Sequence, residues 1–523
     1  MALQMLGGHA MSVAVSRGAD GAPQVKRVRT PSDLAGASHA DVGATFFNAP
    51  AYPAFNRLLS KLGVQVNDML GSVSITPFGA KHPLCIPFSR HGKLSVAGLT
   101  PRVGVWGLRL QQVLTRAEKE LKGETFDGPT LAEFLVRQRF DPYPEPSAAP
   151  PAAETAHRRR AEQLAAAGRR LAKSSFHDQF LLPLIESFWG ALRSDVLGYS
   201  ARNALGYMTG SFKASPLKGA AMREIEGGLG VYAGAVESKL AATPDSVRVR
   251  THCAVSRLRH DPLARTYTVE SRAPAPAPFA HLAGAGAAAV GGGYGPEPGQ
   301  GPGDVVVHPE AFDAVVVATN GWWAKQVLAD VPHAAPVREV LGTITYLPGH
   351  IAIHGDMSVI PAKESARSVV NITVVPEATP LDDPPAPSSG CCTCGAGPGA
   401  PFRGTMRGFF TAYKPWHFAP GLPVLKTWLN PALLRRPELL PQPMYLLQEF
   451  YHPQPNVAYY KVPALLEHHQ GAHGLHLAGL HAGGSAVDDH ETALLTGLRA
   501  ARRLAPQSAF LAEIWPEGAR GAA

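Results

Sequence analysis

The alternation of apolar and polar positions divides the chain into strand-like and helix-like segments. Residues 247–251 (VRVRT) and 267–271 (YTVES) alternate with the period of a half-buried strand. Residues 312–319 (FDAVVVAT) form a β-branched apolar run, typical of a parallel strand that is buried on both faces. Residues 176–191 and 222–241 predict helical segments that Pro or Gly interrupts. The mixture predicts an α/β fold: a mostly parallel sheet with helices, and a second domain woven through it.

Three stretches interrupt this pattern. Residues 142–173 combine Pro-rich with Ala- and Arg-rich sequence, residues 273–304 are almost only Ala, Pro and Gly, and residues 376–404 are rich in Pro, Ser, Cys and Gly. Such compositions bury too little apolar surface to offset the entropy that ordering costs. We therefore interpret all three as low-complexity insertions on the surface.

The C-terminal segment is the most informative part of the chain. A short apolar strand at 475–478 ends in Gly479, a loop of small residues follows, and a helix then opens with the acid residues Asp489 and Glu491. The positive end of such a helix can receive a cofactor oxygen. Ala493 and Gly497, four residues apart on that helix, allow another backbone or a flat ligand to approach closely.

The N-terminal part carries a second series of motifs. Gly7-Gly8-His9 precedes a strand-like Ser12–Val15 segment, and an Asp41-Val42-Gly43 motif is followed by Tyr52-Pro53 before a helix. Further motifs follow in order along the chain: Ser72-Val73-Ser74, Leu181-Leu182-Pro183, Glu226-Gly227-Gly228, Val255, His354-Gly355-Asp356, Leu429-Asn430-Pro431 and Tyr451-His452-Pro453. In this order they resemble a family of NAD/FAD-binding flavoproteins within the amine oxidase and phytoene desaturase superfamily.

The resemblance implies an FAD-dependent oxidoreductase of the amine oxidase or desaturase type. Its fold would be α/β, with a Rossmann-like FAD-binding domain, incomplete at its N-terminus, interleaved with a mixed α+β substrate domain. The FAD-binding domain would comprise residues 1–40, 220–330 and 470–523, and the substrate domain residues 41–219 and 331–469.

The resemblance also implies the cofactor contacts. The backbone of Val255 would face the adenine, and Gly7 and Gly8 the diphosphate, beside His9, which stands where amine oxidases usually carry Arg. Gly479 would lie at the ribityl and isoalloxazine end of FAD, together with Glu491, Thr492 and Ala493. Leu480 departs from the family, which often has an acid or a small polar residue there.

The glycine fingerprint of a dinucleotide site is not found in its usual context. Residues 284–289 and 395–400 both match G-x-G-x-x-A, but neither follows a strand or opens a helix, as a pyrophosphate site requires. A complete fingerprint unit needs about 30 residues, and only six precede Gly7. We therefore expect the chain that begins at Met1 to bind FAD weakly or not at all.

Composition narrows the remaining classes. The net charge of +8 depends partly on the tract Arg158-Arg159-Arg160, which has few aromatic neighbours and indicates a solvated face, with no nucleic acid as partner. The odd number of five cysteines indicates a reducing, intracellular compartment and favours the cytoplasm, with an organelle as the alternative. Cys391, Cys392 and Cys394 have no fourth ligand, so no metal site is expected. We expect neither a secretory signal nor a transmembrane segment.

No catalytic residue can be assigned from the pattern. Lys426 has two interpretations: an amine near the flavin, as in amine oxidases, or a surface lysine at a strand edge, which we favour. Trp322 and Trp323 are interpreted as packing at the domain interface. The substrate would be a small or lipid-like molecule, with an amine as a weaker alternative. A truncated or degenerate protein that keeps the fold without tight FAD binding, and serves as a non-catalytic binding protein, is the alternative function.

Shortening residues 273–304 or 376–404 to a few Gly and Ser residues should leave the melting temperature nearly unchanged, because neither stretch has a hydrophobic periodicity. Thermal unfolding of each shortened protein tests this. A fall of more than several degrees would mean that the stretch packs against the core.

Overall fold

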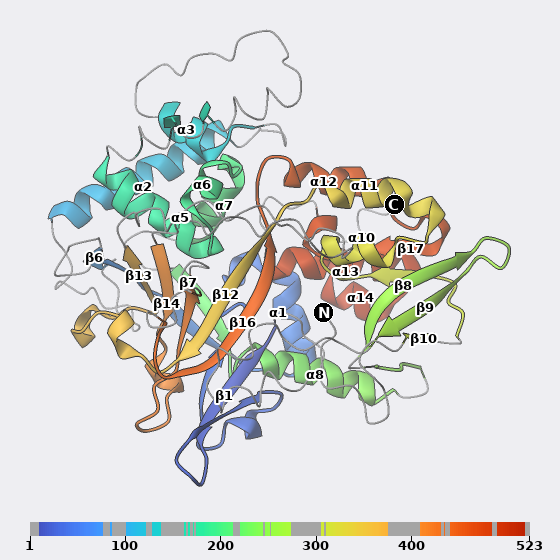
Figure 1. Ribbon diagram of the computed structural model, residues 1–523, viewed down its shortest axis with the longest axis horizontal. Helices are drawn as coiled ribbons and strands as arrows, with labels where there is room; N and C mark the ends of the chain where they lie inside the picture. The colour runs from blue at the N-terminus through green and yellow to red at the C-terminus, as the bar shows by residue number, and fades with distance from the viewer. Residues whose placement is uncertain are drawn as a thin grey trace, which may run out of the picture.

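A computed structural model defines the architecture of the chain (Figure 1). It describes residues 10–76, 84–85, 101–121, 128–137, 162–163, 166–167, 171, 174–212, 220–243, 246–250, 253–272, 305–307, 310–374, 408–429, 434, 440–483 and 489–517. The expected insertions 273–304 and 376–404, most of 142–173, and Gly7, Gly8 and His9 lie outside the described residues.

The largest sheet has seven strands in the order β16-β12-β15-β14-β13-β5-β6. Their bounds are β5 Val73–Thr76, β6 Leu84–Cys85, β12 Tyr346–His354, β13 Val370–Val374, β14 Gly408–Ala412, β15 Leu425–Leu429 and β16 Met444–Pro453. Within this sheet only β13 and β5 run parallel, and the other neighbours are antiparallel. The mixed α/β class is therefore confirmed, whereas the expectation of a mostly parallel sheet is wrong for the largest one.

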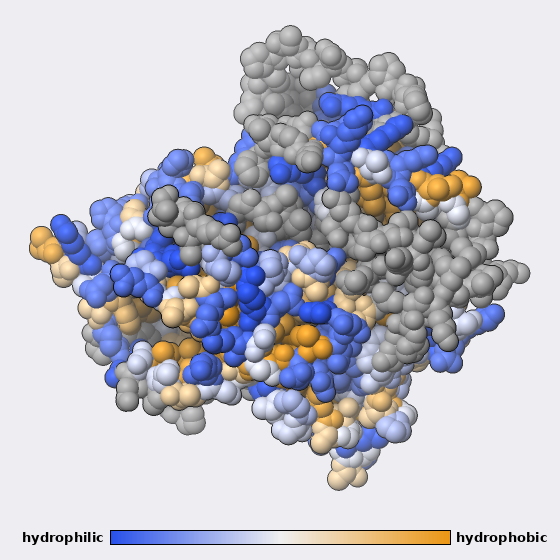
Figure 2. Space-filling model, turned by 180° about the vertical axis from the view of Figure 1, so that it is seen from behind, coloured by the Kyte–Doolittle hydropathy of each residue, from blue (hydrophilic) through white to orange (hydrophobic). Residues whose placement is uncertain are grey.

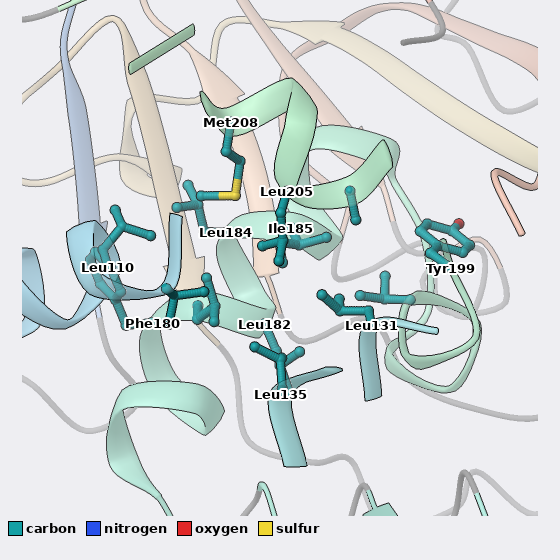
Figure 3. Close-up of a cluster of buried hydrophobic side chains, with 14 of the residues drawn as sticks. Leu110, Leu131, Leu135, Phe180, Leu182, Leu184, Ile185, Tyr199, Leu205 and Met208 are labelled. Carbon is teal, nitrogen blue, oxygen red and sulfur yellow. The ribbon is translucent and has the colours of Figure 1, made fainter. Parts of the chain in front are cut away.

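A group of helices covers one face of this sheet (Figure 1). It contains α2 (Pro101–Glu120), α3 (Leu131–Arg137), α5 (Leu182–Trp189), α6 (Arg193–Leu197) and α7 (Ala201–Phe212). Leu131, Leu135, Leu184 and Leu205 of these helices are fully buried against one another (Figure 3). The same core takes in Val370, Ile372 and Phe410 of the sheet, so alternate residues of the strands face the helices.

A second group of elements surrounds the N-terminal strands. β1 (Ser12–Arg17) pairs antiparallel with β2 (Pro23–Arg27) and β3 (Ser38–Asp41), and β4 (Val66–Gly71) pairs antiparallel with β7 (Ala220–Ile225). Helix α1 (Pro53–Leu62) begins with Pro at its first position and ends at Gly63, whose φ of 71° gives the left-handed cap. Helix α8 (Leu229–Ala241) contacts β1, β7 and α1.

The third group contains the C-terminal elements. β8 (Ala254–Asp261), β9 (Thr266–Arg272) and β10 (Val305–Val307) form an antiparallel meander beside the parallel pair β11 (Val315–Val317) and β17 (Leu475–Leu477). The accompanying helices are α10 Gly321–Val327, α11 Ala335–Gly342, α12 Val462–Glu467, α13 His490–Leu504 and α14 Ala509–Ile514.

Side-chain and loop atoms complete the hydrogen bonding of β17. Leu477 N donates to Gln470 Oε1 (2.9 Å), and Gln470 Nε2 donates to the Leu477 carbonyl (3.1 Å). Gly471 N donates to the Leu475 carbonyl (2.7 Å). These groups of β17 are thus bonded without a second neighbouring strand.

The predicted elements agree with the structure where the local pattern is strong. The strands at 12–15, 267–271 and 475–477 and the helices after Tyr52-Pro53 and Gly228 are confirmed. The strand expected at 247–251 is wrong, because residues 247–250 are exposed and form no strand. The strand at 312–319 shrinks to β11, with Val316 39% exposed, so it is parallel but not buried on both faces. Residues 222–225, expected as helix, belong to β7.

The outer surface is mixed in character. On the face opposite to that of Figure 1, hydrophobic residues lie in small groups among hydrophilic ones (Figure 2). No helix in the described part of the chain is long and apolar enough to cross a bilayer.

Gly230→Ala tests how closely α8 packs on the backbone of Val28, the residue that follows β2. A Cβ atom there would overlap the carbonyl oxygen of Val28, a backbone atom that cannot move away by rotating a side chain. Gly230→Ala should lower the free energy of unfolding by roughly 1–3 kcal/mol. Gly107→Ala, in the exposed part of α2 with no atom within 4 Å, should raise it by about 0.5–1 kcal/mol. Urea unfolding of both variants measures these changes. Equal changes in the free energy of unfolding would contradict the close packing at Gly230.

Candidate functional site

The ends of β11 and β17 form the first part of the candidate site. The two strands run parallel with Val315 opposite Leu475, and Ala478 N donates to the Val317 carbonyl (3.0 Å). Gly479 follows directly with φ of 121°, a conformation that side chains disfavour. A Cβ there would lie 3.2 Å from the His481 ring and 3.6 Å from the Thr319 carbonyl oxygen. The strand therefore ends in a bare stretch of backbone beside the end of its parallel neighbour.

The start of α13 closes this region. Asp489 caps the helix by accepting a hydrogen bond from Thr492 N (2.8 Å). Thr496 Oγ1 accepts from Gly479 N (2.8 Å) and donates to the Ala493 carbonyl (2.7 Å), so the helix also holds Gly479 in place. Gly497 has no atom within 4 Å of a Cβ position, so no backbone in the described part of the chain approaches that side of the helix.

Glu491 lies in the first turn of α13 but is bonded elsewhere. Its two carboxylate oxygens accept hydrogen bonds from Ala54 N (2.7 Å) and Phe55 N (2.8 Å), in the first turn of α1. Burial raises the pKa of Glu491, and these two hydrogen bonds partly offset that rise. The side chain joins the starts of two helices that are more than 430 positions apart in the sequence.

Val255 lies in β8, opposite Ser271 of β9. Its carbonyl accepts a hydrogen bond from the indole nitrogen of Trp323 (3.0 Å). The neighbouring Trp322 stacks on Tyr451 with ring centroids 6.3 Å apart, and both tryptophans pack against the hydrophobic core around α10 and α11. This packing agrees with the expectation for the tryptophan pair.

His481, beside Gly479, and His490, the first residue of α13, each have a ring nitrogen without a partner in the described structure. His481 is 3% exposed, and its Nε2 has no hydrogen-bond partner. His490 packs edge-on against Phe55, with ring centroids 4.5 Å apart, and its Nε2 also has no partner. Burial lowers the pKa of both imidazoles to about 4, so both are neutral at pH 7. A buried polar atom without a partner costs about 1–3 kcal/mol and marks a place where a ligand atom could bond.

Asp41, at the end of β3, organises a separate group of buried polar and charged side chains. Its Oδ1 accepts hydrogen bonds from Ser12 Oγ (2.6 Å) and Leu229 N (2.8 Å), while Ser12 Oγ accepts from Gly230 N (2.8 Å). The carboxylate and the hydroxyl thus satisfy the first donors of α8, at the positive end of that helix.

Lys414 and Glu224 form an ion pair next to Asp41. Lys414 Nζ lies 2.7 Å from Glu224 Oε2 and 3.7 Å from Asp41 Oδ2, and it donates to the Thr45 carbonyl (3.0 Å). Trp416 Nε1 donates to Glu224 Oε1 (2.8 Å), and His417 Nε2 lies 3.4 Å from the same oxygen. Burial alone would raise the pKa of Glu224, but the hydrogen bond from His417 and the charge of Lys414 outweigh it, and the pKa lies well below its ordinary value.

Lys426 is buried in β15, a strand with neighbours on both sides, so the favoured interpretation of a surface lysine at a strand edge is wrong. Its Nζ donates to the Gly43 carbonyl and to Thr45 Oγ1 (3.0 Å). Burial lowers the pKa of Lys426 to about 7, with Asp41 raising it and Lys414 lowering it further. The amine therefore changes its charge near neutral pH.

The two lysines together hold the segment that follows β3. Lys414 Nζ donates to the carbonyl of Thr45. Lys426 Nζ donates to the side-chain hydroxyl of Thr45 and to the carbonyl of Gly43. No local sequence pattern points to Lys414, Glu224 or His417. The burial of Lys426 did have a signal in the sequence, because a charged residue stands inside the apolar strand Leu425-Lys426-Thr427-Trp428.

The structure therefore brings some predicted site residues together and leaves others apart or undescribed. Gly479, Thr492 and Ala493 lie in one hydrogen-bonded unit, whereas Glu491 turns to α1 and Val255 to Trp323. Gly7, Gly8 and His9 lie outside the described residues. Within the described part of the chain, no group of three His, Cys, Asp or Glu side chains is placed to hold a metal ion.

Comparison with solved structures identifies the class of fold. No protein-family model matches the sequence, and no curated protein matches it significantly. The fold is similar to that of putrescine oxidase. Putrescine oxidase bound to putrescine aligns over 97% of this chain and 92% of its own, with a TM-score of 0.51 and 9% identity. A variant from a redesign of cofactor binding in the same enzyme gives a TM-score of 0.52 at 10% identity and the same coverage. At such identities the likeness shows a shared fold, and the expected amine oxidase architecture is confirmed at that level.

The lowered pKa of Lys426 predicts how stability changes with pH. The unfolded chain binds a proton on this amine below pH 10.5, whereas the folded protein does so only below about pH 7. Stability should therefore rise between pH 7 and pH 9, by up to about 1.4 kcal/mol per pH unit more than in Lys426→Met. Urea unfolding at pH 7, 8 and 9 measures the difference. Lys239→Met, at an exposed position of α8, is the control and should follow the wild type; parallel curves for wild type and Lys426→Met would contradict the prediction.

Proposed function

We propose that the protein is an FAD-dependent oxidoreductase of the amine oxidase or desaturase type. The observation that carries the proposal is the parallel pair β11 and β17, which ends in Gly479 with its backbone bare and its φ at 121°. A backbone without a side chain at a strand end is where a flat, extended cofactor can approach. The shared fold with putrescine oxidase supports it independently of any single residue.

The residues around Gly479 fit such a cofactor. His481 and His490 offer unpartnered ring nitrogens, and the open side of Gly497 leaves room along α13. In the proposal, Gly479, Thr492 and Ala493 lie along the ribityl and isoalloxazine end, Val255 lies at the adenine, and Gly7, Gly8 and His9 at the diphosphate. The Rossmann-like character of the N-terminal part, and the division into an FAD-binding and a substrate domain, belong to the same proposal.

When bound, FAD supplies the acceptor for a hydride taken from the substrate. The protein's own residues would orient the substrate and keep water out. Lys426 is the candidate for an amine beside the flavin, because it is buried and changes its charge near pH 7. Lys414 and Glu224 would keep the Gly43–Thr45 segment in place beneath it. The substrate class that we propose is a small or lipid-like molecule.

A second candidate function has its own support. Glu491 and the Val255 carbonyl, two of the residues that the resemblance assigns to FAD, are already hydrogen-bonded within the protein. Interactions that satisfy these groups internally favour a protein that keeps the fold without tight FAD binding. Such a protein would serve as a non-catalytic binding protein.

Titration of the purified protein with FAD separates the two candidates. Binding at a one-to-one ratio, followed by flavin absorbance and by quenching of flavin fluorescence, is the result that the oxidoreductase predicts, and it would overturn the expectation that the chain beginning at Met1 binds FAD weakly or not at all. Gly479→Ala should weaken this binding at least tenfold, because the new methyl group meets the His481 ring and its φ is strained.

The matched control is Gly421→Ala. Gly421 also has a positive φ, of 68°, but it lies in an exposed turn with no atom within 4 Å of a Cβ position. This variant should lose about as much stability as Gly479→Ala and still bind FAD like the wild type. Wild-type protein that takes up no FAD would favour the non-catalytic alternative, and equal FAD affinities of the two variants would remove Gly479 from the site.

A further inference from the structure

Three histidines from separate parts of the chain meet beside the meander β8–β10. They are His260 in β8, His333 in the turn Pro332–Ala334 before α11, and His473 in the turn Ala472–Gly474 before β17. Their ring centroids are 4.6 Å apart for His260 and His333, 4.4 Å for His333 and His473, and 6.0 Å for His260 and His473. The rings pack against one another, so the cluster joins three segments of the chain.

Tyr267 of β9 fixes the centre of the cluster. Its ring is fully buried, and its hydroxyl lies 3.0 Å from the His473 carbonyl, to which it donates, and 2.9 Å from His333 Nε2. Since the hydroxyl has one proton, His333 Nε2 must donate to it, which leaves a further proton to bind at Nδ1. The Nε2 atom of His260 is buried and has no partner in the described structure.

The cluster lies at the far end of two strands that lead to the candidate cofactor site. His473 is two residues before β17, the strand that leads to Gly479, and His260 is in the strand that carries Val255. Gly474, next to His473, packs so closely that a Cβ there would lie 2.5 Å from the Asp313 carbonyl oxygen before β11. Separation of the three rings would therefore loosen β8, β11 and β17 together.

We propose that the His260–His333–His473 cluster is an acid-sensitive clasp: it holds the meander and β17 together at neutral pH and opens on mild acidification, which releases the cofactor. The last step rests on the proposed function; the opening itself does not.

The lowered pKa of His333 determines that the cluster opens as the pH falls. Burial first, then the neighbouring His473 and His260, lower the pKa of His333 to about 4, against an ordinary value of 6.5. In the opened form, His333 takes up a proton below about pH 6.5, whereas in the closed cluster it does so only below about pH 4. The closed cluster therefore loses stability relative to the opened form as the pH falls from about 6.5 to about 4. The other charged groups nearby are engaged: Asp261 accepts from the amides of Leu263 and Ala264, and Asp330 pairs with Arg257 at 3.0 Å.

Hydrogen–deuterium exchange of the full-length protein at pH 7.5 and pH 5.5, corrected for the intrinsic rate, tests the clasp. The backbone amides of β8 and β9 should exchange up to roughly tenfold faster at pH 5.5. In His333→Gln this acceleration should vanish, because the amide can still donate to Tyr267 but binds no proton. His473→Asn, in which asparagine tolerates the φ of 53°, should reduce the acceleration only in part, because burial still lowers the pKa of His333.

The control is His468→Gln, which removes an exposed histidine outside the cluster and should keep the wild-type acceleration. The amides of β8 and β9 are the decisive ones, because β17 contains His476, whose pKa burial also lowers. Exchange that does not change between the two pH values, or that accelerates equally in His333→Gln, would overturn the clasp. In protein loaded with FAD, flavin should be released at pH 5.5 by the wild type and retained by His333→Gln. A protein that never takes up FAD would refute the proposed function, while the exchange result would still decide the clasp.

Discussion

The carboxylate of Asp41 links more elements of this protein than any local pattern along the chain suggests. It closes the N-terminal end of α8, bonds the hydroxyl of β1 and lies 3.7 Å from Lys414, which in turn pairs with Glu224 of β7. These groups are all buried, so each charge depends on its partners for the free energy that hydration would otherwise supply. Removal of one member of such a buried pair leaves a charge uncompensated and typically costs about 3–5 kcal/mol. The position of the Gly43–Thr45 segment follows from this network, because Lys426 of β15 bonds the Gly43 carbonyl and Lys414, which follows β14, bonds the Thr45 carbonyl.

The same network shows which features a sequence can reveal and which it cannot. The strand at Ser12–Val15, the helix after Tyr52-Pro53 and the strand that ends at Gly479 were predictable, because their signals lie within a few residues of each other. Lys426 was assigned to a surface because alternation in LKTWL does not say whether a strand has one neighbour or two. The bond from Lys414 to Thr45 spans 369 positions, and nothing in a local window reports it. Residues 247–250 illustrate the opposite error, since their alternation is regular but no strand among the described residues pairs with them.

Two residues that a family resemblance assigns to a cofactor prove to have partners inside the protein. Glu491 bonds the first turn of α1, and the Val255 carbonyl bonds Trp323. Each of these contacts stabilises the junction between segments that are remote in sequence, and a ligand that uses the same atoms must first displace them. Gly479 also bonds internally, its amide to Thr496 and its carbonyl to Ala482 N, but it has no side chain, so a cofactor could approach the bare face of its backbone without displacing these bonds. A resemblance locates a region well, and the hydrogen-bond partners then decide which atoms in it are available.

The side chain of Gln470 has a consequence beyond the fold. Its amide donates to and accepts from the backbone of Leu477 just as a neighbouring strand would, while Gly471 bonds Leu475. An apolar strand whose donors and acceptors point outward is a template on which another polypeptide can add, and such addition begins many forms of aggregation. Here a single amide side chain occupies those positions within the same molecule. The strand can thus remain short and apolar, as a close approach to a flat ligand would require, without offering its backbone to other copies of the chain.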